Sequence, residues 1–257
     1  MELISPAEYA KRAVLAVQEY TLLSAQSMAN VFRHPRYGED IIQQADLIGV
    51  GSLPIVVMAG AFTGLVLALN YSPTLERFGS LTLTGQLVSL TMVRELGPVM
   101  TSLMMAGRNA TGMASELGSM KVTEQIDAMR ALGTDPIKKL ITPRVLATVV
   151  MVFFLTIISD LVGLAGGYFY SFAVLHLDTY QYWNSAYQSL TYNDVITGLI
   201  KPVFFGFIIA TVGCYYGITT TGGTQGVGRS TTQAMVTASV LILAADAVLA
   251  QLLLLLR

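Results

Sequence analysis

Charged residues are scarce in this sequence of 257 residues, at 12% of the chain, whereas soluble domains average about 25%. The formal net charge is only −1, which excludes a strong overall attraction to nucleic acid. Cys214 is the single cysteine, so neither a disulfide framework nor a thiol-based metal cluster can form within the chain. The two histidines, His34 and His176, are far apart in the sequence, which argues against a histidine-rich metal site.

Long apolar runs are abundant instead, and hydrophobic residues make up 53% of the chain. A membrane-spanning helix needs about 20 mainly apolar residues. Five windows meet this requirement, at 47–70, 83–107, 145–175, 196–218 and 233–256. The sequence therefore predicts an all-α integral membrane protein with five transmembrane helices in a domain that covers residues 45–257.

The first 44 residues form a separate region in this prediction. Apolar residues recur at helical spacing between Tyr9 and Met28, with charged and amide side chains between them. This pattern is typical of an amphipathic helix that lies in the membrane interface. A short helix packed against the bundle fits the pattern equally well.

The distribution of lysine and arginine predicts the orientation of the chain. These residues gather before the first span and in the 108–144 segment, whereas the 176–195 segment has none. Because such residues are enriched in cytoplasmic segments, we expect a cytoplasmic N-terminus, a cytoplasmic 108–144 loop and a C-terminus outside. The basic residues of the N-terminal region are Lys11, Arg12, Arg33 and Arg36.

Ionisable residues interrupt the apolar spans at five positions. Each costs about 2.5–3.5 kcal/mol at the centre of a spanning helix, so we expect each to be compensated. Counting from the span ends places four of them near mid-depth and Lys201 farther out. They are either buried ion pairs that determine helix register or the lining of a polar cavity for a substrate headgroup. The five residues are Arg94, Glu95, Asp160, Lys201 and Asp246.

The stretch VRELGPV, residues 93–99, combines two of these charges with a proline. Adjacent residues on a helix point about 100° apart, so Arg94 and Glu95 face different neighbours. We expect Arg94 to lie against Asp160 or Asp246, and Glu95 against Lys201. Pro98 cannot donate a hydrogen bond to the carbonyl of Arg94, which predicts a helix kink beside the charges.

The 108–144 loop has a helical pattern of its own. Apolar residues recur from Leu117 to Leu132, Gly133 follows where a helix would end, and Asp135-Pro136 begins a turn. The pattern predicts a short amphipathic helix beneath the membrane, which either docks on the bundle or binds a soluble partner.

The segment GTQGVGRS, residues 223–230, resembles a phosphate-binding loop with Arg229 in place of lysine. That motif requires a preceding β-strand in an α/β domain, and here membrane helices lie on both sides. We interpret the segment as a tight cytoplasmic turn.

Taken together, the motifs resemble a known family. The run from Val93 to Val145 is similar to the signature region of MlaE/YrbE-type permeases, the membrane subunits of lipid ABC transporters that work with MCE-domain proteins. The segment GVGRSTTQAMVTAS, followed by Asp246, resembles the last loop and helix of that family. The resemblance covers roughly residues 45–250.

The resemblance implies a homodimer with an outward-opening lipid cavity at the dimer seam. It further implies a separate ATPase, which carries ATP and Mg²⁺ and docks on residues 116–133, and it allows for a small STAS-domain accessory subunit. The charged pocket positions of the family match Arg94, Glu95, Lys201 and Asp246. The implied ATPase contacts are Glu116, Gly118, Lys121, Glu124 and Asp127.

The resulting expectation is a non-enzymatic permease subunit, without a cofactor of its own, in a bacterial inner membrane. It would move phospholipid between that membrane and an MCE-domain carrier and so maintain outer-membrane lipid asymmetry. An ion-coupled secondary transporter of a lipid or amphiphile is the main alternative, because it also uses buried carboxylates. A membrane-embedded scaffold is a third possibility.

Overall fold

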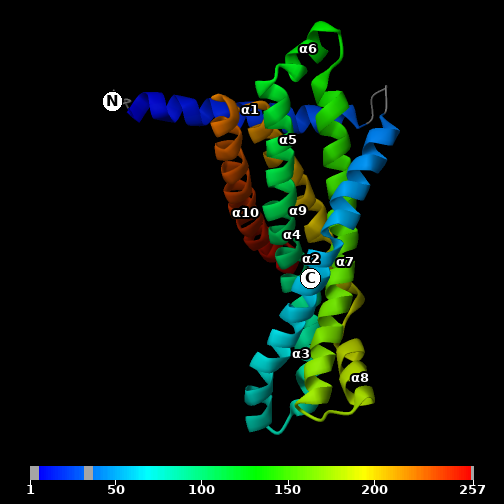
Figure 1. The fold of residues 1–257 in the computed structure, drawn as a ribbon. Helices are drawn as coiled ribbons and strands as arrows, with labels where there is room; N and C mark the ends of the chain where they lie inside the picture. Colours follow the sequence, from blue (N-terminus) through cyan, green and yellow to red (C-terminus); the bar gives the residue numbers. More distant parts are fainter. Residues whose placement is uncertain (1–5, 32–36, 256–257) are drawn as a thin grey trace.

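The computed structural model describes residues 6–31 and 37–255, and this part of the chain is helical without a strand. Arg33, His34 and Arg36, which entered the sequence predictions, lie outside the described residues. Figure 1 shows an elongated bundle crossed at one end by α1.

In chain order, the helices are α1 (Pro6–Asn30), α2 (Gly38–Arg77), η1 (Leu81–Leu83), α3 (Thr84–Thr91), η2 (Met92–Leu96), α4 (Gly97–Met105), η3 (Ala106–Ala110), α5 (Thr111–Val122), α6 (Gln125–Ala131), η4 (Ile137–Ile141), α7 (Thr142–Ala173), α8 (Thr179–Ser189), α9 (Tyr192–Ile218) and α10 (Gly223–Leu255).

Four helices in the described part of the chain are long and apolar enough to cross a membrane. They cover Gly38–Arg77, Ile137–Ala173, Tyr192–Ile218 and Gly223–Leu253. The remaining predicted span, 83–107, is also helical, but η2 and η3 are π-helical turns that divide it. Because α3, η2, α4, η3 and α5 follow one another without a gap, they form one helical run with two local changes of hydrogen-bond register. The prediction of a helical membrane protein is confirmed, whereas the count of five spans stays a prediction in which this divided run is the fifth.

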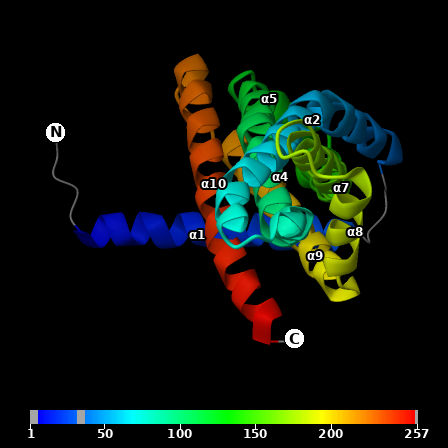
Figure 2. The ribbon, with the colours of Figure 1, turned by 90° about the horizontal axis from the view of Figure 1, so that it is seen from below.

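The connections alternate between the two ends of the bundle. In Figure 1, α6 and the start of α10 lie at the end crossed by α1, whereas α8 and the start of α3 lie at the other end. This arrangement agrees with the predicted alternation for the first four crossings. Helix α10 is steeply inclined: it ends about halfway along the molecule in Figure 1 and runs across the view in Figure 2. The predicted location of the C-terminus outside therefore stays a prediction.

Helix α1 packs on the bundle along part of its length, as the second of the two alternatives drawn from its sequence pattern expects. Its later half packs on the bundle: Leu23 is buried in the main core, and the Tyr20 hydroxyl lies 2.9 Å from Thr211 Oγ1 on α9. Other apolar side chains of the helix, including Val14, Val17 and Met28, are exposed. An amphipathic helix held across the end of a bundle with apolar side chains left uncovered is suited to a membrane interface.

Small residues allow α2 and α7 to approach closely over much of their length. A Cβ atom at Gly64 would clash with the backbone carbonyl of Gly163, and one at Gly60 would lie 2.8 Å from the carbonyl oxygen of Ser159. In lipid, helix association depends on such close van der Waals packing. The glycines at four-residue spacing in these two helices therefore serve packing within one chain.

Helix α8, which the span count did not anticipate, closes the end opposite α1. Asp178 caps its first turn by accepting a hydrogen bond from the Tyr180 backbone nitrogen at 3.1 Å. The buried Tyr182 donates its hydroxyl to the Leu164 carbonyl at 3.0 Å, and burial raises the pKa of Tyr182 above its usual range. Trp183 and Tyr187 are exposed at this end, which is typical of the aromatic belt at a membrane interface.

The prediction for residues 223–230 was wrong in one respect. The turn is formed by Gly222 and Gly223, whose φ angles are 91° and 66°, so it overlaps the segment only at its first residue. Residues 223–230 are instead the first turns of α10. Two consecutive glycines absorb the left-handed conformation, which leaves the following residues free to continue as a helix.

Candidate functional site

The π-helical turn η2 holds Arg94 and Glu95 in the middle of the divided helical run. The Gly97 amide donates to the Met92 carbonyl, five residues earlier, in place of the usual four. Pro98 follows at the start of α4, where its missing N–H would break the regular ladder. The kink predicted beside the charges stays a prediction; the structure shows a wider helical turn there, a feature found frequently at functional sites.

Lys201 is the centre of a charged cluster formed by three helical segments. Its side chain is 0% exposed, and its Nζ pairs with Glu95 of η2 and lies 2.9 Å from Asp246 Oδ1 of α10. The Asp246 contact has ion-pair distance but lacks hydrogen-bond alignment, since Oδ1 has no hydrogen-bond partner among the described residues. The predicted pairing of Glu95 with Lys201 is confirmed.

The outer position predicted for Lys201 in the membrane stays a prediction, but the structure extends α9 beyond the predicted window. Helix α9 begins at Tyr192, ahead of the apolar window that starts at 196. Lys201 therefore lies nine residues inside the helix, or about 13 Å along its axis. That position, together with the length of the lysine side chain, brings the ammonium level with Glu95 and Asp246.

Arg94 pairs with a residue that the sequence reasoning missed. Its Nε donates to Asp194 Oδ1 at 2.9 Å, and its Nη2 lies 2.7 Å from the same oxygen. Asp194 is buried in the first turn of α9, where its other oxygen accepts from the Thr191 amide at 3.1 Å as part of a capping box. The signal was available in the sequence, because Thr191 and Asp194 have the spacing of that motif, but a helix start was expected only at 196.

Neither pairing expected for Arg94 is formed, because Asp246 lies against Lys201 and Asp160 does not join the cluster. The carboxylate is buried on α7, and its Oδ1 has no hydrogen-bond partner among the described residues. It lies directly against Gly97, where a Cβ atom would clash with Oδ1. Asp160 thus faces the backbone beside the π-helical turn instead of the arginine.

The cluster is only partly covered within one chain. The side chain of Glu95 is 47% exposed and that of Arg94 is 34% exposed, whereas Lys201 and Asp194 are almost fully covered. One carboxylate and one guanidinium can therefore meet a ligand or a second protein surface, while their partners stay buried. This arrangement can bind a zwitterionic or phosphate-bearing group.

The predicted ATPase-contact residues occupy different environments. Glu116 forms a 2.8 Å ion pair with the buried Arg144, and Gly118 is buried against Thr220. Gly118 therefore does not contribute to an exposed surface in this chain, whereas Glu124 at the junction of α5 and α6 is exposed and has a φ of 61°. The structure also shows that α5 continues the second span as far as Val122, so the short independent helix is only α6.

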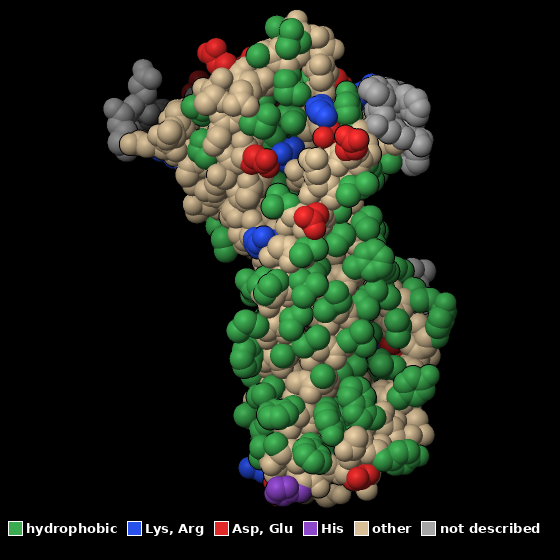
Figure 3. Space-filling model, turned by 45° about the vertical axis from the view of Figure 1, so that its right-hand side comes forward, with side chains coloured by type: hydrophobic (Ala, Val, Ile, Leu, Met, Phe, Trp, Pro, Cys, Tyr) green, Lys and Arg blue, Asp and Glu red, His purple; other side chains and the backbone are tan. Residues whose placement is uncertain are grey.

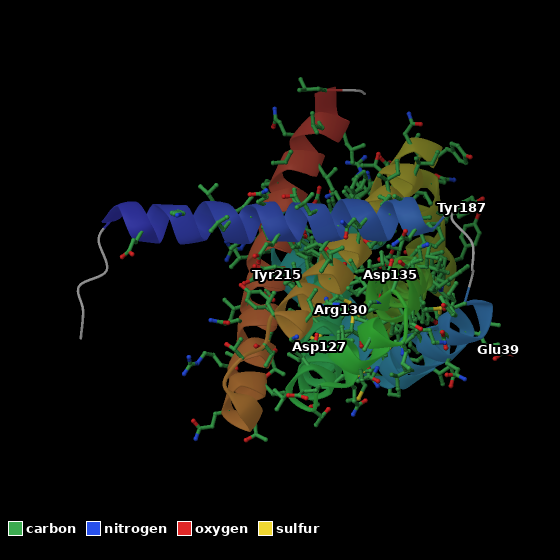
Figure 4. All side chains as sticks on the ribbon, turned by 90° about the horizontal axis from the view of Figure 1, so that it is seen from above. Glu39, Asp127, Arg130, Asp135, Tyr187 and Tyr215 are labelled. Carbon is green, nitrogen blue, oxygen red and sulfur yellow. The ribbon has the colours of Figure 1, made fainter. Side chains whose placement is uncertain are left out.

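Helix α6 carries a small exposed ion-pair group. Lys121 Nζ lies 2.7 Å from Asp127 Oδ2, and Arg130 Nη1 lies 3.4 Å from Asp127 Oδ1. The hydrogen bond from Lys121 lowers the pKa of Asp127, so this carboxylate stays ionised at neutral pH. Figure 4 shows Asp127 and Arg130 at the end of the bundle, to one side of α1. Gly133 ends the helix as predicted, with a φ of 77°.

Within the described residues, no group of three or more histidine, cysteine, aspartate or glutamate side chains could hold a metal ion.

Comparison with known proteins shows extensive similarity to transporter permeases. Residues 41–252 match the family described as Permease MlaE. A probable ABC transporter permease protein of Rickettsia typhi is 41% identical over 91% of this chain and 90% of its own length. The intermembrane phospholipid transport system permease protein MlaE of Haemophilus influenzae is 33% identical over 81% of this chain and 80% of its own.

The similarity extends to a plant protein. The chloroplastic protein TRIGALACTOSYLDIACYLGLYCEROL 1 of Arabidopsis thaliana is 36% identical over 95% of this chain and 69% of its own length.

Proposed function

Because the chain belongs to the MlaE permease family, we propose that it is the membrane subunit of an ABC transporter that moves phospholipid between a bacterial inner membrane and an MCE-domain carrier. The observation that carries this proposal is the Lys201 cluster, whose buried ammonium holds a half-exposed Glu95 near an accessible Arg94. In this function, the cluster contacts the lipid headgroup while apolar helix surfaces contact the tails. Transport to the carrier would maintain lipid asymmetry of the outer membrane.

In this proposed function, a second copy of the chain covers α10. This helix exposes a series of apolar side chains, among them Val236, Val240 and Leu243. It also carries Asp246 into the charged cluster. A homodimer that packs against α10 would enclose the exposed edges of Glu95 and Arg94 in a lipid cavity at the seam.

The energy for transport would come from a separate ATPase subunit docked at α6. This helix projects from the end of the bundle in Figure 1 and carries exposed charges. Helix α5 joins α6 to the run that contains η2 and Arg94. Movement of α6 upon ATP hydrolysis by the partner would therefore reach the charged cluster through one helical run. A STAS-domain accessory subunit could bind the same end of the complex.

Purification of the native complex tests this assignment most directly. We expect mass spectrometry to identify an ATPase and an MCE-domain protein with the chain, together with bound phospholipid. In proteoliposomes, lipid transfer to the carrier should require ATP. Arg94→Ala and Lys201→Ala dimers that assemble and transfer lipid as well as the unmodified complex would contradict the role of the charged cluster.

One observation favours the alternative of an ion-coupled transporter. Asp160 is a buried carboxylate whose Oδ1 lacks a hydrogen-bond partner among the described residues, as expected of a proton-binding group in a membrane. Lipid movement driven by a pH gradient in the absence of any ATPase, and abolished in Asp160→Asn, would support that alternative over the ABC permease.

A further inference from the structure

A pocket with a mainly apolar lining and one cation lies farther along the divided helical run than the charged cluster. It has a volume of about 360 Å³ and lies between the first turns of α2 and the η3–α5 segment. Arg108 lies thirteen residues beyond Glu95 on one helical run, which corresponds to about 20 Å. The pocket is therefore a site of its own. Its lining residues are Gln44, Leu47, Ile48, Arg108, Asn109, Gly112, Met113 and Glu116.

Arg108 is the cation of this pocket, and its contacts leave its charge unbalanced. The guanidinium donates to Ser52 Oγ and, at 3.4 Å, to the Leu47 carbonyl, both of which are neutral. In the described part of the chain, no carboxylate lies within ion-pair distance of it. A guanidinium has five N–H donors and binds phosphate in a forked geometry, so Arg108 retains the capacity to bind an anion.

The helix α2 holds this guanidinium in place. A Cβ atom at Gly51 would lie 2.4 Å from Arg108 Nη2, so a larger residue there would displace the guanidinium from its place along α2. The adjacent Asn109 is buried, and its amide nitrogen donates to the Met105 sulfur at 3.8 Å, which is a weak acceptor. Two donor groups with weak or neutral partners thus occur side by side at the pocket.

The other charged group of the pocket does not neutralise Arg108. Glu116 lies at the far side of the lining, two helical turns along the run, and is paired with Arg144 at 2.8 Å. The pocket therefore offers one uncompensated positive charge at Arg108. This charge pattern fits a ligand with one phosphodiester group, which carries one negative charge.

Exposed apolar side chains beside the pocket suit the acyl chains of a lipid. On α2, Leu47 is 57% exposed and Val50 is 64% exposed, and the exposed apolar surface continues through Met58 and Phe62. Figure 3 shows hydrophobic side chains covering the column of the molecule below a more polar and charged end. A molecule with a phosphate in the pocket could extend apolar chains along α2, which a soluble phosphate compound cannot do.

From this geometry, we infer that the pocket binds the phosphate of a glycerophospholipid from the leaflet on the α1 and α6 side, with Arg108 as the phosphate ligand. This inference goes beyond the proposed function, because it concerns the opposite side of the membrane from the proposed cavity and requires only binding, without transport.

Photo-cross-linking tests the inference in the full-length protein. The purified protein is reconstituted in phosphatidylcholine vesicles that contain a small fraction of phosphatidylethanolamine with a diazirine on its headgroup. After illumination, mass spectrometry of the digest should find lipid on peptides that contain residues 44–48 and 108–116. Their absence would overturn the inference. ATP-dependent transfer is measured separately, so failure of one proposal is distinguishable from failure of the other.

Two variants and a matched control assign the cross-links to the pocket. Gly112→Leu fills the pocket from a helix position where an added Cβ meets nothing within 4 Å, and should reduce cross-linking about tenfold. Arg108→Gln should have an effect of about the same size, since a hydrogen bond to a charged group contributes roughly that factor. Gly228→Leu, at an equally open helical glycine outside the pocket, should leave cross-linking unchanged.

Soluble competitors distinguish the source of the phosphate. Millimolar inorganic phosphate or glycerophosphoethanolamine should not displace the lipid, because neither can use the apolar surface of α2. Displacement by either compound would assign the pocket to a soluble phosphate compound and overturn the inference. Unchanged cross-linking in Gly112→Leu would also overturn the inference. This test remains valid even if Arg108→Gln fails to fold.

Discussion

Lys201 shows how a single residue can be both costly and necessary in this protein. Its ammonium is fully buried, and two carboxylates from different helices compensate it. Removing one member of a buried ion-pair group leaves an uncompensated charge, which is far more destabilising than replacing the whole group by apolar residues. The cluster therefore links η2, α9 and α10 through charge.

For Lys201→Met, we expect a loss of about 3 kcal/mol in the free energy of unfolding, which thermal unfolding in detergent would record as a lower Tm. The combination Lys201→Met with Asp246→Asn should recover part of this loss, because one of the two unpaired carboxylates is then neutral. Equal Tm values for the single and the combined variant would show that Asp246 is not coupled to Lys201.

Asp194 has two separable roles, one in the Arg94 ion pair and one in capping α9. Asp194→Asn should lose the ion pair but keep an oxygen that can accept from the Thr191 amide. Asp194→Ala should lose both interactions and be about 1 kcal/mol less stable than Asp194→Asn. The same thermal measurement on both variants tests this, and identical stability would refute the capping role.

At the scale of elements, close helix contact and local helix irregularity determine where the charges lie. Helices α2 and α7 pack through glycines, and the divided run α3–α5 carries a π-helical turn at each of its two arginines, Arg94 and Arg108. A π-helical turn rotates the following residues relative to a regular helix. Each turn thus changes which side chains of the run face α9 or α2.

Gly64→Ala should lower the stability of the α2–α7 contact by about 1–3 kcal/mol, because its Cβ would meet the backbone of Gly163, which cannot rotate away. Gly228→Ala on α10 is the control. Its Cβ has open space, and alanine is the better helix former, so its Tm should equal or exceed that of the unmodified protein. A stable Gly64→Ala protein would mean that the two helices can separate without loss.

Helix α6 should bind the proposed ATPase through Asp127 at any pH between 5 and 8. The hydrogen bond from Lys121 lowers the pKa of Asp127 in the folded protein. The interaction of this carboxylate with Lys121 is therefore fully present above the pKa of the unfolded chain, and it is lost only as the pH falls through the lower pKa of the folded protein. Asp127→Asn should reduce co-purification of the ATPase with little change in Tm, because exposed ion pairs contribute little to stability. Glu39 is exposed at the same end of the molecule in Figure 4, so Glu39→Gln is the control and should leave co-purification of the ATPase unchanged.

At the scale of the whole molecule, two differently built ends enclose an apolar column. One end carries α1, α6 and most of the loop cations, and the other carries α8 with its aromatic side chains (Figure 1). This asymmetry predicts which end faces the cytoplasm, because lysine and arginine remain on that side. The orientation can be tested directly.

Cysteine labelling should place the two ends on opposite sides of the membrane. The native Cys214 is buried, so it contributes little background. Tyr187→Cys on α8 should react with an impermeant maleimide in spheroplasts, whereas Ala131→Cys on α6 should react only after permeabilisation. Labelling of Ala131→Cys in intact spheroplasts would reverse the predicted orientation.

Much of the architecture follows from the sequence alone, because it depends on local properties. Apolar length determines which segments can span a membrane, and Gly133 marks the end of α6 through its backbone conformation. The pairing of Glu95 with Lys201 was predictable since few opposite charges were available inside the spans. The membership of the family is likewise carried by the linear motif between residues 93 and 145.

Only the tertiary structure decided how the helices are rotated, inclined and extended. The early start of α9 brings Asp194 to Arg94, Asp160 instead faces Gly97, and α10 crosses the bundle at a steep incline. The physical reason is that the transfer of a segment into lipid depends on its composition, whereas the partner of each charge depends on packing between helices. That packing is a property of several segments at once, and no single segment encodes it.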